Sequence, residues 1–274
     1  MKTLYLTDLD GTLLRSDERL SKYALDTINR FIESDGCFSY ATGRSIATAS
    51  KVTVGLNLAA DIPVICHNGA FIIGNKSNKI MQSNFFAQDE TVAIKRVLIE
   101  HDISPIIYAH ISDEEKFTFI NCPISDGMRF FLDSRKGDPR CRIVTSIDDL
   151  YMGDVFSVIC ISNDKELAPV HEIFKQDKRF QCIYHKEMYS NAWWCEILPQ
   201  NATKANAALQ LKKMLNCDKL VVFGDGLNDL SLFSVADECY AMSNAVPELK
   251  EIATAIIETN NNDGVAKWIE KNML

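Results

Sequence analysis

Short apolar runs, each ending in a polar or glycine-containing turn, recur near both ends of this chain and constrain its fold more than any other feature. The runs with the length of buried strands are residues 3–7, 38–41, 62–66, 219–223, 239–242 and 255–257. Helical patterns lie between most of them; after Ser21, for example, apolar residues keep helical spacing until Gly36. Alternating strands and helices predict an α/β fold with a doubly wound parallel sheet, whose ligands bind at the carboxyl ends of the strands.

The middle of the chain has a different pattern. Apolar and polar residues alternate, as in strands with one exposed face, over residues 106–111, 116–121 and 155–161. Helical patterns cover residues 90–100, 127–132 and 166–174. We therefore expect residues 84–187 to form an inserted α+β domain. Residues 1–83 and 188–274 should together form the doubly wound, Rossmann-like core.

Composition excludes several classes of protein. The 274 residues are 47% hydrophobic, which suffices for a sizeable core and excludes a disordered chain. A formal net charge of −8 and the lack of any Lys/Arg run argue against nucleic-acid and anionic-membrane partners. No stretch approaches the roughly 18 to 20 apolar residues of a membrane span, and carboxylates at Asp8 and Asp10 interrupt any signal-peptide core. We expect a cytoplasmic protein, whose oligomeric state the sequence does not specify.

The cysteines are scattered and contain no Cys-x-x-Cys pair. This pattern predicts reduced thiols packed as small apolar side chains rather than a disulfide framework or a zinc site. The histidines also lack any mutual spacing that is typical of a metal site. The nine cysteines are Cys37, Cys66, Cys122, Cys141, Cys160, Cys182, Cys195, Cys217 and Cys239.

An acidic motif, Asp8-Leu9-Asp10-Gly11-Thr12, directly follows the first predicted strand. Carboxylates two positions apart can point the same way from an extended backbone, and Gly11 permits a sharp exit from the strand. The alternative is an acidic turn with a local cap. An EF-hand loop is excluded, because Arg19 stands where that loop requires glutamate.

A second acidic motif, Gly224-Asp225-Gly226-Leu227-Asn228-Asp229, follows the strongly apolar run 220–223. Its alternative is an ordinary glycine-rich strand-to-helix turn, with Asp229 as a helix-capping acid. In a doubly wound sheet both acidic motifs lie at one edge, so that Asp8, Asp10 and Asp225 can converge. Converging carboxylates repel each other and require a cation. Oxygen ligands without histidine or cysteine favour Mg²⁺.

Two further segments fit an anion. Ala41-Thr42-Gly43-Arg44 follows a predicted strand and opens an apparent helix, where a hydroxyl and exposed N–H groups suit a phosphate. Lys204 begins the helical run 205–215. Each signal is weak alone, because Thr-Gly turns are common and most lysines are solvated surface charges.

The ordered set of motifs resembles the haloacid dehalogenase superfamily, most closely its Cof-like phosphatases, in which a large α/β cap is inserted between the second and third motifs. Asp-Gly-Val-Ala at 263–266 is also similar, whereas the inserted region resembles that family in length and alternation only. The motifs are Asp-Leu-Asp-Gly-Thr-Leu-Leu at 8–14, Ala-Thr-Gly-Arg at 41–44, Asn-Gly-Ala at 68–70, Thr-Lys at 203–204 and Gly-Asp-Gly-Leu-Asn-Asp at 224–229.

The resemblance implies roles for the carboxylates. Asp8 would be the nucleophile, a role that suits a carboxylate because it needs no deprotonation before attack. Asp10 would act as general acid and then as general base, and its backbone carbonyl would bind the metal. Asp225 would complete the protein ligands of Mg²⁺, together with Asp8. Asp229 would stand behind these ligands as a supporting group.

The resemblance also implies which groups bind the phosphoryl oxygens. These are the backbone of Leu9, Thr42 with the N–H of Gly43, Lys204 and Asn228. Two further residues keep two interpretations each. Arg44 contacts substrate or forms a structural ion pair, and Asn68 contacts substrate or only satisfies a turn.

Taken together, the sequence predicts a Mg²⁺-dependent phosphatase that hydrolyses phosphomonoesters of a small metabolite, most plausibly a sugar phosphate, through an aspartyl phosphate. The alternatives are a sugar phosphomutase of the same fold and a non-catalytic sensor that binds a phosphorylated metabolite. The inserted domain would act as a lid whose inner face sets specificity. Its candidate polar groups include His110, Arg129 and His185.

Overall fold

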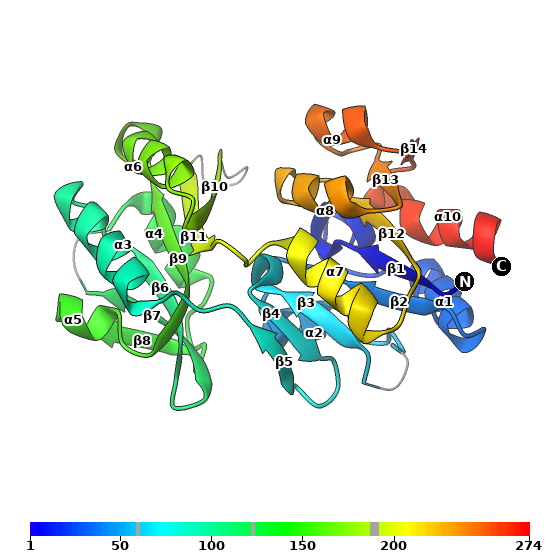
Figure 1. Cartoon of the computed structure of the whole chain (residues 1–274), viewed down its shortest axis with the longest axis horizontal. Helices are drawn as coiled ribbons and strands as arrows, with labels where there is room; N and C mark the ends of the chain where they lie inside the picture. The colour runs from blue at the N-terminus through cyan, green and yellow to red at the C-terminus, as the bar shows by residue number, and fades with distance from the viewer. Residues whose placement is uncertain (59–60, 122–123, 187–191) are drawn as a thin grey trace. The chain divides into compact units, whose positions relative to one another are not determined.

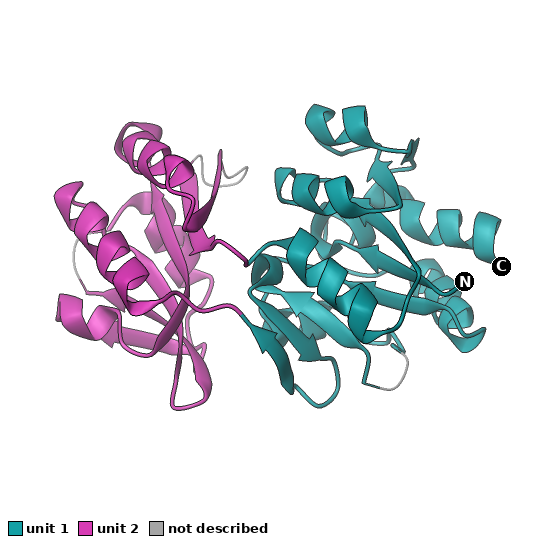
Figure 2. Cartoon of the chain, viewed as in Figure 1, with its two compact units in different colours: residues 1–83, 202–274 teal, residues 84–201 magenta. Residues whose placement is uncertain are grey.

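A computed structural model of the chain describes residues 1–58, 61–121, 124–186 and 192–274. Cys122 and the predicted end of the insertion at residue 187 lie outside these described residues. The chain forms two compact units (Figure 2). The first consists of residues 1–83 and 202–274, and the second of residues 84–201.

The first unit contains a five-stranded sheet in which every pairing is parallel. Its neighbouring strands run in the order β14 (Ala255–Ile257), β13 (Glu238–Met242), β12 (Lys219–Gly224), β1 (Thr3–Thr7) and β2 (Cys37–Tyr40). The predicted apolar runs match these strands to within one residue at each end, because the central strands β12 and β1 are covered on both faces and need continuous apolar sequence, whereas β14 at the edge is largely exposed. The predicted doubly wound parallel sheet is confirmed.

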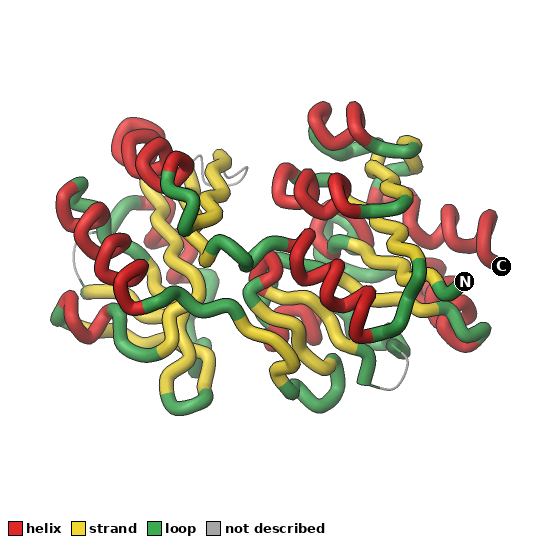
Figure 3. The backbone as a smooth tube through the Cα atoms, in the orientation of Figure 1, coloured by secondary structure: helices red, strands yellow, loops and turns green. Residues whose placement is uncertain are grey.

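Helices cover both faces of this sheet (Figures 1 and 3). On one face α1 (Lys22–Glu33) packs against α10 (Gly264–Met273), and the Trp268 ring of α10 contacts the rings of Tyr5 and Phe223. The other helices of the unit are α2 (Ile46–Val52), α7 (Lys204–Met214), α8 (Leu230–Val235) and α9 (Pro247–Ile252), of which α7 packs against α8 and α8 against α9. Short helical turns cover Leu9–Leu13, His67–Gly69, Leu227–Asp229 and Asn260–Asn262.

The sheet continues beyond β2 into an antiparallel segment, in which the strand predicted at 62–66 is confirmed as β3, whereas its antiparallel pairing and its partner strands were not predicted. A parallel bridge from Ala41 to Ile65 joins β2 to β3 (Pro63–Cys66). Strand β3 then pairs with β4 (Phe71–Gly74), and β4 with β5 (Ile80–Ser83). The segment places the turn at residues 67–69 beside the carboxyl ends of β1 and β2.

The second unit is a six-stranded sheet covered by helices α3 (Gln88–Glu100), α4 (Asp126–Asp133), α5 (Ile147–Leu150) and α6 (Asp164–Gln176). All its strand pairs are antiparallel except β7 with β8. The strands run in the order β10 (Phe180–Lys186), β11 (Trp193–Pro199), β9 (Asp154–Ser162), β6 (Ile106–Ile111), β7 (Glu114–Ile120) and β8 (Cys141–Val144). The α+β character predicted for this region agrees with these elements.

Two expectations for the second unit need correction. Strand β11 was assigned to the core by the boundary at residue 187, but it pairs with β9 and β10, so the unit extends to residue 201. Strands β6 and β9 were expected to have an exposed face, but residues 106–109 and 155–161 are all buried. Both faces are covered because helix α4 packs on the face opposite α6: Phe131 of α4 contacts Trp194, whereas Leu167 of α6 lies in the hydrophobic core on the other face.

Among the described residues, no helix combines the length and apolar character needed to cross a membrane.

Gly69 joins the antiparallel segment to the start of α7. Its φ is +101°, and a Cβ atom there would lie 2.2 Å from the carbonyl oxygen of Thr203, the residue that caps α7. Only a residue without Cβ allows this approach, which fixes where Lys204 begins the helix.

We predict that Gly69→Ala lowers the free energy of unfolding by about 2 kcal/mol or more beyond the loss caused by Gly55→Ala. Both substitutions strain a backbone of positive φ, but only the one at Gly69 also overpacks its surroundings. Gly55 is the matched control, since its φ is +91° but the nearest atom to a Cβ is at an ordinary 3.5 Å. Urea denaturation of the two variants provides the measurement. Equal losses would show that the approach to Thr203 is not tight.

Candidate active site

The carboxyl ends of four neighbouring strands bring the predicted motifs together. The N–H of Asp8 donates to the carbonyl of Phe223 over 2.9 Å, which places the end of β1 beside that of β12. The N–H of Thr42 donates to the carbonyl of Ile65, also over 2.9 Å, and so joins the ends of β2 and β3. The chain therefore turns out of the sheet at Asp8, Thr42 and Asp225 along one edge, as parallel strands require.

A buried lysine lies at the centre of this edge. Lys204 Nζ is 2.9 Å from Asp8 Oδ1 and 2.8 Å from Asp229 Oδ1. Asp229 Oδ2 accepts hydrogen bonds from the N–H groups of Asp225, over 3.0 Å, and of Gly226, over 3.2 Å. Asp229 is fully buried and both of its oxygens are engaged by protein groups. It thus caps the turn, as one of its two interpretations predicted, and also pairs with Lys204.

Asp225 is held against the first motif by contacts that the sequence analysis missed. Thr12 Oγ1 donates to Asp225 Oδ1 over 2.7 Å. Gly11 has a φ of +73°, and a Cβ there would lie 2.2 Å from Asp225 Oδ2. Asn244, just beyond β13, donates from Nδ2 to the Gly11 carbonyl over 2.8 Å. The position of Thr12 within the acidic motif could have indicated that it contacts this site. Nothing near Asn244 in the sequence indicates its role.

The electrostatics of this cluster are unbalanced. Burial raises the pKa of Asp8 well above its ordinary value, against the opposing charge of Lys204, and Asp229 and Asp225 raise it further. Burial also raises the pKa of Asp225 to about 6, although its bond from Thr12 opposes the shift. Burial alone would lower the pKa of Lys204, but the charges of Asp229 and Asp8 raise it overall. Three carboxylates thus share one ammonium group, so a further positive charge would stabilise the cluster.

Asp10 faces Arg44. The Nε atom of Arg44 donates to Asp10 Oδ2 over 2.7 Å, and its NH2 group bonds both Asp10 Oδ1 and Glu18 Oε2. The hydrogen bonds that Arg44 donates to these carboxylates raise its pKa, although burial opposes them, so the guanidinium stays charged. The structure thus shows the ion-pair interpretation of Arg44. Glu18 was not singled out from the sequence.

Asn68 links the motif at 41–44 to the motif at 224–229. Its N–H donates to the carbonyl of Thr42 over 3.0 Å, and its Oδ1 accepts from Asn228 Nδ2 over 3.2 Å. A Cβ at Gly43 would lie 3.3 Å from the Asn68 side-chain amide, so the two residues are neighbours. Asn68 has a φ of +53° and is buried. These contacts agree with the turn interpretation of Asn68.

The helix expected to open at Thr42 begins later. Ser45 is the N-cap of α2, and its Oγ accepts from the Thr48 N–H over 3.2 Å. Thr42 Oγ1 instead accepts from the Arg44 N–H over 3.1 Å, within a tight turn. Helix α2 has seven residues, so the predicted helix start at 42–44 is wrong, and any phosphate contact there must come from the turn itself. Leu9 is fully buried beside the nucleophile candidate.

The acidic cluster has the composition of a site for a hard cation. Single oxygens of Asp8, Asp225 and Asp229 lie within 4.8 Å of one another. Carboxylate oxygens are the ligands that Mg²⁺ prefers. Since Asp229 is already engaged, Asp8 and Asp225 are the side chains best placed to bind an ion directly.

Known proteins resemble this chain over almost its full length. The 5-amino-6-(5-phospho-D-ribitylamino)uracil phosphatase YwtE of Bacillus subtilis is 26% identical, over 96% of this chain and 96% of its own length. The solved structure of a haloacid dehalogenase-like hydrolase from B. subtilis matches with a TM-score of 0.79, 22% identity and full coverage of both chains. A second one, from Bacteroides thetaiotaomicron, matches with a TM-score of 0.77, 23% identity and 99% coverage of both. The family model for haloacid dehalogenase-like hydrolases matches residues 5–269, so this chain belongs to the haloacid dehalogenase-like hydrolase family.

Proposed function

We propose that this hydrolase is a Mg²⁺-dependent phosphatase that releases phosphate from small phosphorylated metabolites, with sugar phosphates as its substrate class. The observation that carries the proposal is the buried cluster at the edge of the parallel sheet. There Lys204 contacts Asp8, and Asp225 and Asp229 leave the negative charge only partly compensated. A phosphatase needs such a nucleophile beside cationic groups that hold the phosphoryl oxygens. A cytoplasmic location stays a prediction from the sequence.

The residues present fit a magnesium ion. Its ligands would be the carboxylates of Asp8 and Asp225 and the backbone carbonyl of Asp10. The raised pKa values of Asp8 and Asp225 support this assignment, since they reflect negative charge that a cation would neutralise. When bound, Mg²⁺ supplies positive charge to the phosphoryl oxygens.

Asp8 would attack phosphorus with one carboxylate oxygen, forming an aspartyl phosphate as the ester P–O bond breaks. Asp10 would give its proton to the departing alkoxide. Asp10 would then take a proton from the attacking water, and hydrolysis of the acyl phosphate returns Asp8 and releases phosphate. Lys204 favours ionised Asp8, which is the form that attacks.

The phosphoryl oxygens would be held by groups around Asp8. We assign the N–H groups of Leu9 and Gly43, the hydroxyl of Thr42, the ammonium of Lys204 and the amide of Asn228. The contacts of Asn68 to Thr42 and Asn228 support this assignment, because they fix two of these groups relative to each other. Such preorganised donors stabilise charge that spreads over the oxygens in the transition state.

Arg44 would position Asp10. Its guanidinium binds both oxygens of that carboxylate. Because both oxygens of Asp10 accept hydrogen bonds from the guanidinium, Arg44 must release one of them before that oxygen can carry the proton for the leaving group.

We further propose that the second unit, inserted between Ser83 and Ala202, is the cap that selects the substrate. The B. subtilis relative YwtE is named as a phosphatase of a compound with a phosphorylated ribityl group. This name supports a sugar or sugar-alcohol phosphate as the substrate here. A screen of phosphorylated metabolites by kcat/KM tests this class, and higher values for nucleotides or phosphopeptides would contradict it. Free phosphate without an isomerised sugar phosphate distinguishes the phosphatase from a phosphomutase.

We predict that Asp8→Asn lowers phosphate release from p-nitrophenyl phosphate by about three orders of magnitude or more, because the amide cannot form the acyl phosphate. Asp26→Asn is the matched control and should retain wild-type activity, since Asp26 is exposed on α1 and pairs only with Lys22 among the described contacts. Circular dichroism checks that both variants are folded. More than a tenth of wild-type turnover in folded Asp8→Asn would exclude Asp8 as the nucleophile.

We also predict that Mg²⁺ affinity falls as the pH drops through the pKa of Asp225, about 6 without metal. Below that pH a proton competes for the carboxylate, so the apparent affinity should fall about tenfold for each further pH unit. Conversely, above it the ionised cluster is self-repulsive, and Mg²⁺ should raise Tm more at about pH 7.5 than at about pH 5. Thermal melts with and without Mg²⁺ measure this, and Asp225→Asn should abolish the Mg²⁺ effect. A shift in Tm that is equal at both pH values would contradict the assignment.

A further inference from the structure

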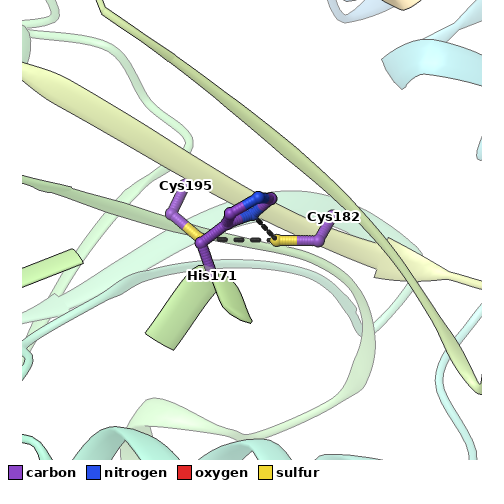
Figure 4. Close-up of side chains that lie close together, drawn as sticks. All are labelled: His171, Cys182 and Cys195. Carbon is purple, nitrogen blue, oxygen red and sulfur yellow. Dashed lines mark hydrogen bonds between the residues drawn. The ribbon is translucent and has the colours of Figure 1, made fainter. Parts of the chain in front are cut away.

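A second cluster of metal-binding side chains lies in the second unit, far in sequence from the acidic motifs. His171 of α6, Cys182 of β10 and Cys195 of β11 point toward one another (Figure 4). His171 Nδ1 is 3.4 Å from Cys182 Sγ, and Cys182 Sγ is 3.4 Å from Cys195 Sγ. One donor atom from each of the three lies within 4.8 Å of the other two. The sequence analysis predicted no zinc site, because no spacing in the sequence indicates this convergence.

The distances are close to those of a tetrahedral zinc site. With Zn–S near 2.3 Å and Zn–N near 2.0 Å, tetrahedral angles place two sulfur ligands about 3.8 Å apart and sulfur and nitrogen about 3.5 Å apart. The His171–Cys182 and Cys182–Cys195 separations of 3.4 Å are shorter by only a few tenths of an ångström, and the third pair, His171 and Cys195, lies within 4.8 Å. Small side-chain rotations would therefore admit the ion.

The strand register opposes the competing outcome, a disulfide between the two cysteines. Cys182 is paired with Ile197, and Cys195 with Tyr184, so the two cysteines are diagonal neighbours across β10 and β11. Diagonal positions on antiparallel strands are about 7 to 8 Å apart. This range begins at the Cα distance of about 7 Å beyond which a disulfide needs backbone movement, and both cysteines are free thiols in the structure. Both thiols therefore remain available as ligands.

The surroundings hold the histidine ring in place. Tyr184 stacks on His171 with ring centroids 4.6 Å apart and an interplanar angle of 12°. The Tyr184 hydroxyl donates to Asp164 Oδ1 of the same helix over 2.6 Å. The outer nitrogen, His171 Nε2, lies 3.9 Å from Glu172 Oε1. The His171 side chain is 15% exposed, which gives an ion a path to the otherwise buried sulfur atoms.

We propose that His171, Cys182 and Cys195 form a binding site for a thiophilic divalent cation, Zn²⁺, which ties helix α6 to strands β10 and β11. A water molecule takes the fourth position, since His171 and Cys182 are only partly buried. Binding converts two thiols to thiolates and releases their two protons to solvent. The resulting site, one Zn²⁺ with two thiolates and a neutral imidazole, has no net charge, which suits its apolar surroundings.

This site differs in chemistry from the proposed magnesium site. Sulfur and imidazole ligands select zinc, whereas the carboxylates of the first unit select magnesium. The two sites can therefore be loaded and tested separately. The zinc proposal does not depend on the proposed phosphatase activity.

Cobalt substitution of the full chain provides the test. Reduced, chelator-treated protein is titrated with Co²⁺ in excess Mg²⁺, and we expect a thiolate-to-cobalt charge-transfer band that saturates at about one equivalent and is displaced by Zn²⁺. The acidic cluster has no sulfur and cannot produce this band. Absence of the band in the wild-type protein, or a disulfide joining Cys182 to Cys195 in reduced preparations, would overturn the proposal.

Variants assign the band to the cluster. Cys182→Ser should abolish it, and Cys141→Ser should leave it unchanged, because Cys141 is an exposed free thiol on β8. His171→Gln is the second test if Cys182→Ser fails to fold, and it should weaken zinc binding at least tenfold. A band of equal intensity in Cys182→Ser or unchanged zinc affinity in folded His171→Gln would place the metal elsewhere.

Discussion

The buried ammonium group of Lys204 is the interaction on which the acidic site depends. It contacts both Asp8 and Asp229. Asp229 in turn accepts hydrogen bonds from the N–H groups at residues 225 and 226. A charge removed from water this completely is tolerated only when its partners are close and fully hydrogen-bonded. Lys204 therefore couples the position of helix α7 to the loops that follow β1 and β12.

This arrangement would explain how a protein of net charge −8 binds the proposed anionic substrate. Lys204 supplies one positive charge locally, and the excess of carboxylates creates the demand for a cation. The raised pKa of Asp8 and of Asp225 records the same imbalance. A cation bound at this edge would make the local field favourable to phosphate, while the rest of the surface stays acidic.

Much of the first unit could be predicted from the sequence, because its central strands are buried on both faces and have continuous apolar sequence. The convergence of Asp8, Thr42 and Asp225 then follows from the geometry of parallel strands. The start of helix α2 could not be placed, because Ser45 competes with Thr42 as a cap. The role of Asn244 could not be predicted, because its contact with Gly11 spans 233 residues and leaves no local sequence pattern.

The second unit was predicted less completely for the same reason. Antiparallel strands β10 and β11 bring Cys182 and Cys195 together through register, which no spacing rule in the sequence reveals. The adjacent rings of Trp193 and Trp194 on β11 contact different partners: Trp193 stacks on Tyr184, and Trp194 contacts Phe131. Alternation along a strand separates neighbours that adjacency in sequence suggests should pack together.

The central claim, that Asp8 carries the phosphoryl group, is tested most directly by trapping the intermediate. The enzyme is quenched in acid during turnover of a phosphomonoester and reduced with borohydride, and the Asp8 peptide is analysed by mass spectrometry. We predict conversion of Asp8 to homoserine, dependent on substrate and Mg²⁺, because an acyl phosphate is reduced whereas a free carboxylate is not. Steady phosphate release with unmodified Asp8, or homoserine formed at another aspartate, would contradict the account.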